Sequence, residues 1–291
     1  MDQTLADLLQ LLVPERIEQN IFRGESHDVG TPQVFGGQVL AQALSAAGAT
    51  VKQGAVHSLH AYFLRRGDIE APIVYQVDHA RNGLSFFNRR VVAIQHGKQI
   101  FNMTASFQIP EDGLEHQATM PKVDGPDSLA DVGDVKPEDM DKLPEPVRRF
   151  LQHERPFHVR PVPRNQDSSG AGDVEPVKYV WMKAVDRMPD DPQLHTVLLA
   201  YISDYQLLGT ATIPHGDQSI LRSNLQMASL DHAMWIHKTC RVDDWLLFSY
   251  DSPRAAGARG LARGQVFSAD GVLVASIAQE GLIRLRNKQS R

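Results

Sequence analysis

The two halves of the chain repeat one order of segments, and this duplication restricts the fold more than any other feature of the sequence. In the first half, the helical segment VFGGQVLAQALSAAGATV precedes VHSLHAYFLRRGD and three strand-like runs. In the second half, YISDYQLLGTATIPHG precedes ASLDHAMWIHKT and three further strand-like runs. Aligning HSLHAYF with SLDHAMW pairs His60 with His232. We therefore expect an α+β unit, a helix followed by an antiparallel meander, duplicated in tandem with the two sheets paired edge to edge.

Glycine turns separate the strand-like runs of both halves. Asn82-Gly83 and Asp270-Gly271 are typical of tight hairpins, and His96-Gly97 occupies the same place in its half as the second of these. Apolar and polar residues alternate only partly along the runs. We therefore expect a helix to cover one face of each sheet.

An acidic, proline-rich segment lies between the two halves. We place an N-terminal unit at residues 1–110, a linker at 111–155 and a C-terminal unit at 156–291. Acidic sequence rich in proline cannot assemble a core of its own, so we expect this linker to be a solvated surface segment. The stretch EPVRRFLQH predicts one short helix within it.

The overall composition excludes several classes of function. The formal net charge of −5 argues against a nucleic-acid or anionic-membrane partner, which would require clustered Lys and Arg. No window holds eighteen uninterrupted apolar residues, and residues 1–18 predict an amphipathic helix rather than a signal peptide. The single cysteine, Cys240, excludes an internal disulfide and suits a reducing compartment, so we expect a cytoplasmic protein without a membrane anchor.

One carboxylate stands in an apolar stretch of the second half. Residues 198–211, LLAYISDYQLLGTA, read as a packed helix in which Asp204 is a costly group to bury. When the two halves are aligned, the polar residues Asp204, Ser229 and Gln279 of the second half pair with Gly36, His57 and Ala105 of the first half, respectively. A carboxylate, a hydroxyl and an amide can together hold and activate one water. Each has an ordinary alternative as well, as an exposed or capping carboxylate or as a strand polar residue.

Other catalytic signatures are missing from the sequence. No G-x-S-x-G nucleophile elbow, P-loop or G-x-G-x-x-G occurs. His57 with His60, or His232 with His237, lacks a third ligand at metal-site spacing, so we expect no metal.

The compared residues carry a family resemblance. The stretches TPQVFGGQVLAQAL, VHSLHAYFLRRGD, ISDYQLL, LDHAMWIH and GVLVASIAQEG resemble the acyl-CoA thioesterase II family, in the right order over nearly the whole chain. The resemblance implies a double hotdog, with a long central helix wrapped by an antiparallel sheet in each half. It also implies hydrolysis of medium- to long-chain fatty acyl-CoA to a free fatty acid and CoA, without a cofactor. The catalytic group would be Asp204, Ser229 and Gln279, with serine where the best-known bacterial members have threonine.

The resemblance suggests where the substrate binds. Backbone N–H groups at Gly36, Gly37 and Gln38 are candidates to stabilise the oxyanion, because a helix N-terminus concentrates such donors. The phosphates of CoA require basic residues, for which the sequence offers Arg65, Arg66, Arg259 and Arg263. A double hotdog usually pairs with further copies, so we expect a homo-oligomer. Two alternatives stay open: a hotdog enoyl-thioester hydratase, and a non-catalytic module that binds acyl-CoA.

Overall fold

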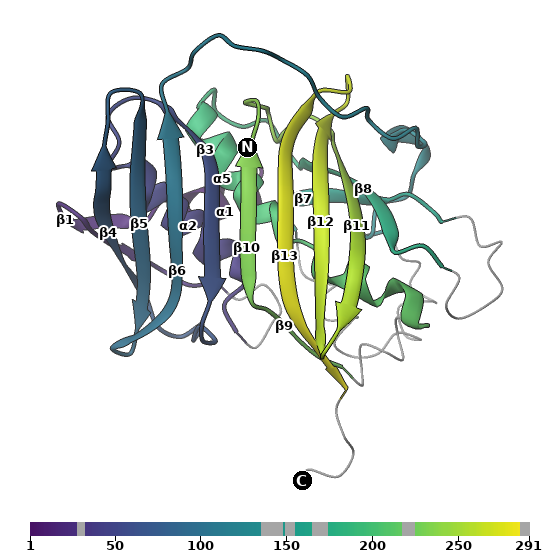
Figure 1. Ribbon diagram of the computed structural model, residues 1–291, viewed down its shortest axis with the longest axis horizontal. Helices are drawn as coiled ribbons and strands as arrows, with labels where there is room; N and C mark the ends of the chain where they lie inside the picture. Colours follow the sequence, from purple (N-terminus) through teal and green to yellow (C-terminus); the bar gives the residue numbers. More distant parts are fainter. Residues whose placement is uncertain (28–32, 135–147, 149–154, 165–173, 217–224, 286–291) are drawn as a thin grey trace.

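The computed structural model describes residues 1–27, 33–134, 148, 155–164, 174–216 and 225–285. Its centre is one antiparallel 13-stranded sheet with the order β1-β2-β4-β5-β6-β3-β10-β13-β12-β11-β8-β7, and β9 pairs with β13 off this path. Figure 1 looks onto this sheet, with the helices behind it. Among the described residues, no helix combines the length and the apolar character needed to cross a bilayer.

The first half is a meander around one buried helix. Helix α2 (Gly36–Gly48) is buried at every position from Gly37 to Ala47, because its Ala, Leu and Val residues occur on all sides. The amphipathic α1 (Gln3–Leu11) buries three leucines, as the sequence predicts. The strands of this half are β1 (Glu15–Glu18), β2 (Ile21–Gly24), β3 (Ala55–Phe63), β4 (Ile73–Asn82), β5 (Phe86–Gln95) and β6 (Lys98–Gln108).

The second half repeats this order with one insertion. Helix α5 (Pro192–Ser203) takes the place of α2, and a 3₁₀ segment, η2 (Leu208–His215), separates it from the strands that follow. The strands are β7 (Phe157–Pro161), β8 (Val177–Ala184), β9 (Leu225–Ser229), β10 (Asp231–Ile236), β11 (Leu246–Ala256), β12 (Arg259–Ser268) and β13 (Leu273–Leu285). The three glycine turns connect β4 to β5, β5 to β6 and β12 to β13, so the hairpin predictions are confirmed.

The halves meet along β3 and β10, which lie side by side in Figure 1. These strands pair antiparallel from Tyr62 opposite Asp231 to Ser58 opposite Trp235. Behind the sheet, α2 packs against α5. The expected tandem duplication with edge-to-edge sheets is therefore what the chain adopts.

The alignment of His60 with His232 is wrong by one residue. Residues directly opposite in an antiparallel pair share a face, and His232 lies opposite the buried Ala61, whereas His60 is on the exposed face. The inward residue of β3 that faces Ala105 on β6 is Leu59, which therefore corresponds to His232. A one-residue slip moves every side chain to the other face, and periodicity alone did not fix the register.

The helical reading of residues 198–211 also needs correction. Helix α5 ends at Ser203, and Asp204 is its C-cap. The corresponding residue at the end of α2 is Ala49, so Gly36 is not the counterpart of Asp204. Gly36 instead begins α2 at the opposite end of that helix, where α2 and α5 bring it against Asp204.

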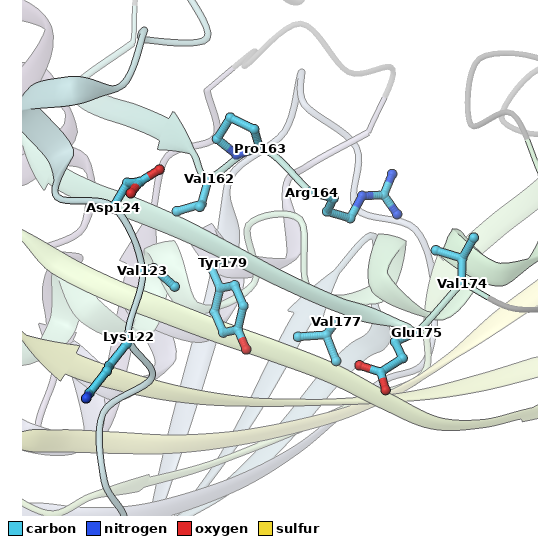
Figure 2. Close-up of a pocket in the computed structure, with 10 residues that line it drawn as sticks. All are labelled: Lys122, Val123, Asp124, Val162, Pro163, Arg164, Val174, Glu175, Val177 and Tyr179. Atoms are coloured by element: carbon cyan, nitrogen blue, oxygen red, sulfur yellow. The ribbon is translucent and has the colours of Figure 1, made fainter. Parts of the chain in front are cut away.

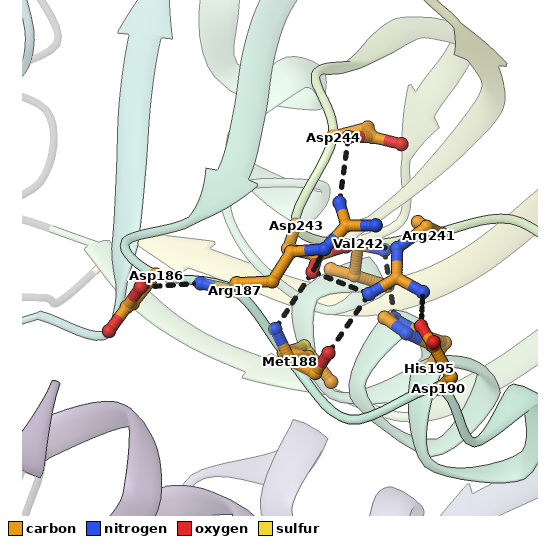
Figure 3. A network of polar contacts seen from close by, with 9 residues as sticks. All are labelled: Asp186, Arg187, Met188, Asp190, His195, Arg241, Val242, Asp243 and Asp244. Atoms are coloured by element: carbon orange, nitrogen blue, oxygen red, sulfur yellow. Dashed lines mark hydrogen bonds and ion pairs between the residues drawn. The ribbon is translucent and has the colours of Figure 1, made fainter. Parts of the chain in front are cut away.

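The start of α5 is held by a network of polar contacts (Figure 3). Asp191 caps the helix by accepting two backbone N–H hydrogen bonds from its first turn. Arg241 and Asp243, between β10 and β11, form an ion pair of 2.8 Å, and the Val242 N–H donates to His195 Nδ1 at 3.1 Å. These contacts fix the helix that presents Asp204 at its far end.

The described part of the linker packs against the second half. Trp181 Nε1 donates to the carbonyl of Asp124 at 2.9 Å, and Met120 and Val123 pack on the outer face of the sheet beside Trp181. The expectation of a merely solvated segment is therefore wrong for these apolar residues. The short 3₁₀ helix η1 (Pro126–Ser128) also lies here. Of the helix expected at 145–153, only Arg148 is within the described residues, and the boundaries of the units stay predictions.

Candidate active site

Asp204 lies where the two halves of the chain contact one another. Its Oδ1 accepts a hydrogen bond of 2.5 Å from Gln279 Nε2, and the backbone N–H of Gly37 donates to the same carboxylate. A Cβ added to Gly36 would lie 2.8 Å from Asp204 Oδ2, so glycine permits this close approach. The C-terminal end of α5 therefore rests on the positive N-terminal end of α2.

The environment of Asp204 raises the pKa of its carboxyl. Burial raises its pKa to about 6, and the hydrogen bonds from Gln279 and Gly37 oppose this shift without cancelling it. A general base works best when its pKa lies near the operating pH. Asp204 is thus ionised at neutral pH and still able to accept a proton.

Gln279 lies on β13 and is 1% exposed. Its Nε2 donates to Asp204 and also lies 3.1 Å from His232 Nδ1. Within the described part of the chain, its Oε1 is buried without a hydrogen-bond partner. A buried acceptor of this kind calls for a donor, and the O–H of a water would satisfy it.

Ser229 reaches the same region from β9. It is the last residue of that strand and lies opposite Gly281 on β13. Because alternate residues of a strand share a face, Ser229 is on the same face as Gln279, two positions along. Ser229 and Gly36 line one cavity of about 290 Å³. The structure thus joins Asp204 and Gln279 directly, and it places Ser229 in the wall of a cavity that is also lined by Gly36, the residue packed against Asp204.

The three candidate oxyanion residues differ in what their N–H groups contact. The Gly37 N–H serves Asp204, and the Gln38 N–H donates to the Phe35 carbonyl at 3.1 Å. Gly36 is the first residue of α2 and has no intrahelical acceptor, and none of the described residues bonds its N–H. The geometry therefore favours the Gly36 N–H as the available donor.

The cavity at Gly36 and Ser229 combines apolar and basic walls. Phe63, Val39 and Ile100 are among its apolar lining, and Arg65 and Arg66 are at its edge. Such a combination suits a ligand with an apolar chain and a charged end.

The four arginines considered for CoA phosphates are now distinguishable. Arg259 and Arg263 each form an ion pair, with a glutamate of β13 at 2.9 Å and an aspartate of β11 at 2.5 Å. Arg65 donates to the Gln99 carbonyl at 2.5 Å. Arg66 has no hydrogen bond or ion pair with the described residues and borders the cavity, which makes it the strongest candidate.

A larger cavity, of about 800 Å³, lies on the outer side of the sheet in the second half, beside Tyr179 (Figure 2). Lys122, Arg164 and Glu175 are in its walls, and none of the candidate catalytic residues is. The larger volume of this cavity is therefore no evidence that it is the reactive site.

Sequence reasoning missed His232, which contacts Gln279, and Ser203, which contacts His232 in turn. In the sequence, His232 is marked only by its likeness to His60 and as a possible metal ligand, and no pattern points to Ser203. No described group of three His, Cys, Asp or Glu side chains is placed to hold a metal ion. His57 and His237 instead each bond a serine hydroxyl, of Ser106 and Ser276 respectively.

Known proteins resemble this chain in both sequence and structure. Residues 147–282 match the family described as "Acyl-CoA thioesterase", and residues 23–108 match "Acyl-CoA thioesterase N-terminal domain". The chain is 44% identical to acyl-CoA thioesterase 2 of Haemophilus influenzae, over 98% of this chain and 99% of that protein. The structure of an acyl-CoA thioesterase II from Mycobacterium marinum superposes with a TM-score of 0.80 at 40% identity, covering 96% of this chain and 99% of that one. A hot dog fold protein from Alicyclobacillus acidocaldarius has a TM-score of 0.75 at 18% identity, covering 97% and 99%, which supports the tandem hotdog fold alone.

Proposed function

Because this chain belongs to the acyl-CoA thioesterase family and is an acyl-CoA thioester hydrolase, we propose that Asp204 is its general base and acts on a water held with Gln279 and Ser229. The substrates would be medium- to long-chain fatty acyl-CoAs. The observation that carries the proposal is the hydrogen bond between Asp204 and Gln279, formed at the N-terminus of α2.

The proposed reaction needs no covalent intermediate. Asp204 removes a proton from the water while the water oxygen forms a bond to the thioester carbonyl carbon. The Gly36 N–H donates to the oxyanion that develops, which is the charge a helix N-terminus favours. Collapse of this intermediate breaks the C–S bond, and CoA leaves as a thiolate that takes up the proton accepted by Asp204, which restores the carboxylate. General-base assistance of this kind typically contributes about 10²–10⁴ in rate.

Each group has a separate part in this scheme. Gln279 Oε1 would accept a hydrogen bond from the second O–H of the water, and the Ser229 hydroxyl would donate to the lone pair of the water oxygen that does not attack, so that the two groups fix its direction. Arg66, and Arg65 beside it, would meet the phosphates of CoA, while the apolar wall of the cavity accepts the start of the acyl chain. Serine and threonine share the hydroxyl that this position requires, so Ser229 would serve as the threonine does.

The two alternative functions are not favoured. A hydratase would leave the thioester intact and require a double bond, and a binding module would have no reason to keep a carboxylate of raised pKa in contact with a buried amide.

The proposal also covers the cellular compartment, the metabolic role and the assembly state of the enzyme. We expect it to act in the cytoplasm in fatty-acid metabolism and to form a homo-oligomer. Light scattering of the purified chain tests the assembly, because a particle mass of 32.4 kDa would contradict it.

Release of free thiol from saturated acyl-CoAs tests the activity. The wild-type chain should release one CoA for each fatty acid formed, and a series of chain lengths should show a preference for medium to long chains. Asp204→Asn should lower kcat by at least a hundredfold. Undiminished thiol release by this variant would refute Asp204 as the general base.

A further inference from the structure

His232 is a fully buried imidazole behind the catalytic amide, and the mechanism above does not use it. Its side chain is 0% exposed. Its Nδ1 lies 3.1 Å from Gln279 Nε2, and its Nε2 lies 2.9 Å from the hydroxyl of Ser203. Ser203 is itself buried, and its Oγ also lies 2.8 Å from the Ala200 carbonyl. The three side chains therefore form a line that leads from α5 to the amide on β13.

The direction of each hydrogen bond in this line follows from chemistry. An ionised Asp204 can only accept, so the Gln279 atom at 2.5 Å must be the amide nitrogen. The same nitrogen faces His232 Nδ1, which must then be the unprotonated, accepting nitrogen. The proton of a neutral imidazole is consequently on Nε2 and is donated to Ser203 Oγ. The Ser203 hydroxyl in turn donates to the Ala200 carbonyl, which accepts only.

The His232 imidazole is neutral in this arrangement. Burial lowers the pKa of His232 to about 3, so it carries no charge at neutral pH and is not itself an acid or base in the reaction. Its contribution is a lone pair held in a fixed direction.

The reversed amide would be unfavourable in two places. Rotating the Gln279 side-chain amide by half a turn would place its Oε1 against the carboxylate of Asp204 and against the lone pair of His232 Nδ1. Gln279 Oε1 would then face two other buried acceptors, the Asp204 carboxylate and His232 Nδ1, with no donated hydrogen between them. His232 thus adds a second preference for the orientation that leaves Oε1 free for a water.

We propose that His232, with Ser203 behind it, is a positioning residue that holds the Gln279 amide with Nε2 toward Asp204 and Oε1 toward the attacking water. The inference rests on the proposed function of Asp204 and Gln279. The first half supplies a comparison: the residue that corresponds to His232 is Leu59, and it lies opposite Ala105. The fold is therefore built equally well without an imidazole in this place, and the imidazole accompanies the amide that it contacts.

Substitutions at His232 separate positioning from packing. His232→Leu fills the space without an acceptor, whereas His232→Asn keeps an oxygen acceptor near the position of Nδ1. We expect H232L to lower kcat at least tenfold with KM within about twofold of wild type, and H232N to recover kcat to within about threefold. S203A should cause an intermediate loss, because the Nε2–H then loses the acceptor that fixes the tautomer. Melting curves of each variant confirm that it is folded.

A double-mutant cycle gives the decisive readout. If His232 acts through the amide, H232L should have no further effect on kcat in a Q279A background. His237→Leu is the matched control, because His237 is an exposed residue just beyond the end of β10 that bonds Ser276 at 2.9 Å, and this variant should retain wild-type kcat.

Two results would overturn the inference. One is an equal loss in H232L and H232N, and the other is a loss that multiplies with that of Q279A. The failure of the general-base proposal looks different, because D204N would then remain active whatever happens at His232.

Discussion

The raised pKa of Asp204 makes the pH dependence of the enzyme a direct test of the site. The carboxyl is shifted from 3.8 to about 6 by burial. A shift of roughly two units corresponds to about 3 kcal/mol of difference between the two protonation states. Only the ionised form can take a proton from water. We therefore expect kcat/KM to be level above pH 7 and to fall about tenfold for each unit below pH 6.

The assay must follow hydrolysis in acid as well as at neutral pH. Product fatty acid can be measured by chromatography between pH 4.5 and 8.5, and enzyme held at each pH can be returned to pH 8 to show that it has not unfolded. The pKa of the free enzyme is read from kcat/KM. An inflection below pH 5, or a flat profile, would refute the assignment of Asp204 as the base.

The same shift predicts the stability of D204N. Between pH 3.8 and about 6 the folded protein keeps a proton on Asp204 that the unfolded chain has lost, so the free energy of unfolding decreases as pH rises through this window. Asparagine at position 204 avoids the cost of burying an ionised carboxylate, but its amide nitrogen donates a hydrogen bond where a carboxylate oxygen accepts one. D204N should exceed wild type by about 1–3 kcal/mol at pH 8, and the difference should vanish near pH 4. Urea denaturation at the two pH values measures it, and a D204N variant less stable at pH 8 would contradict the reasoning.

Three further predictions concern the walls of the site. Ser229→Ala should lower kcat about tenfold or more while Ser229→Thr retains most of it, and equal losses in a thiol-release assay would exclude the hydroxyl as a water ligand. Gly37→Ala places a Cβ 2.3 Å from the Tyr201 carbonyl oxygen, so it should cost about 1–3 kcal/mol in unfolding free energy. Gly113→Ala, with nothing within 4 Å of its Cβ, should be neutral in the same melts. Arg66→Gln should raise KM for acyl-CoA severalfold but leave KM unchanged for a short thioester lacking the nucleotide, and equal KM effects on both substrates would exclude phosphate recognition.

Local signals in the sequence were sufficient for the helix and the meander of each half and for their order, although not for strands β1, β2, β7, β8 and β9. The run of small and apolar residues in VFGGQVLAQALSAAGATV predicts the buried helix α2, and glycine after Asn82 and Asp270 predicts the hairpins. The repeated order of segments predicts the duplicated unit and the joined sheets. These features depend on neighbours a few residues apart, which the sequence shows directly.

Details that depend on packing between distant segments were harder to predict. The apolar residues around Asp204 suggested a continuing helix, although α5 ends at Ser203 and the residues beyond it are buried by tertiary contacts. The match of His60 with His232 was a residue out of register, because resemblance between short segments does not say which face points inward. The apolar residues of the linker were overlooked among their acidic neighbours, yet Met120 and Val123 cover part of the sheet in the second half.

The sequence by itself determined a duplicated α+β chain and supplied Asp204, Ser229 and Gln279, since hydrophobic pattern, turn residues and family resemblance are all carried by residue order. Only the tertiary structure decided that Asp204 caps one helix at the start of the other, that Gln279 bonds it, and that His232 stands behind the amide. The reason is physical. The pKa of a carboxylate and the direction of an amide depend on burial and on contacts within about 3 Å. Such contacts join residues far apart in the chain, and only the folded packing of α2, α5 and the sheet brings them together.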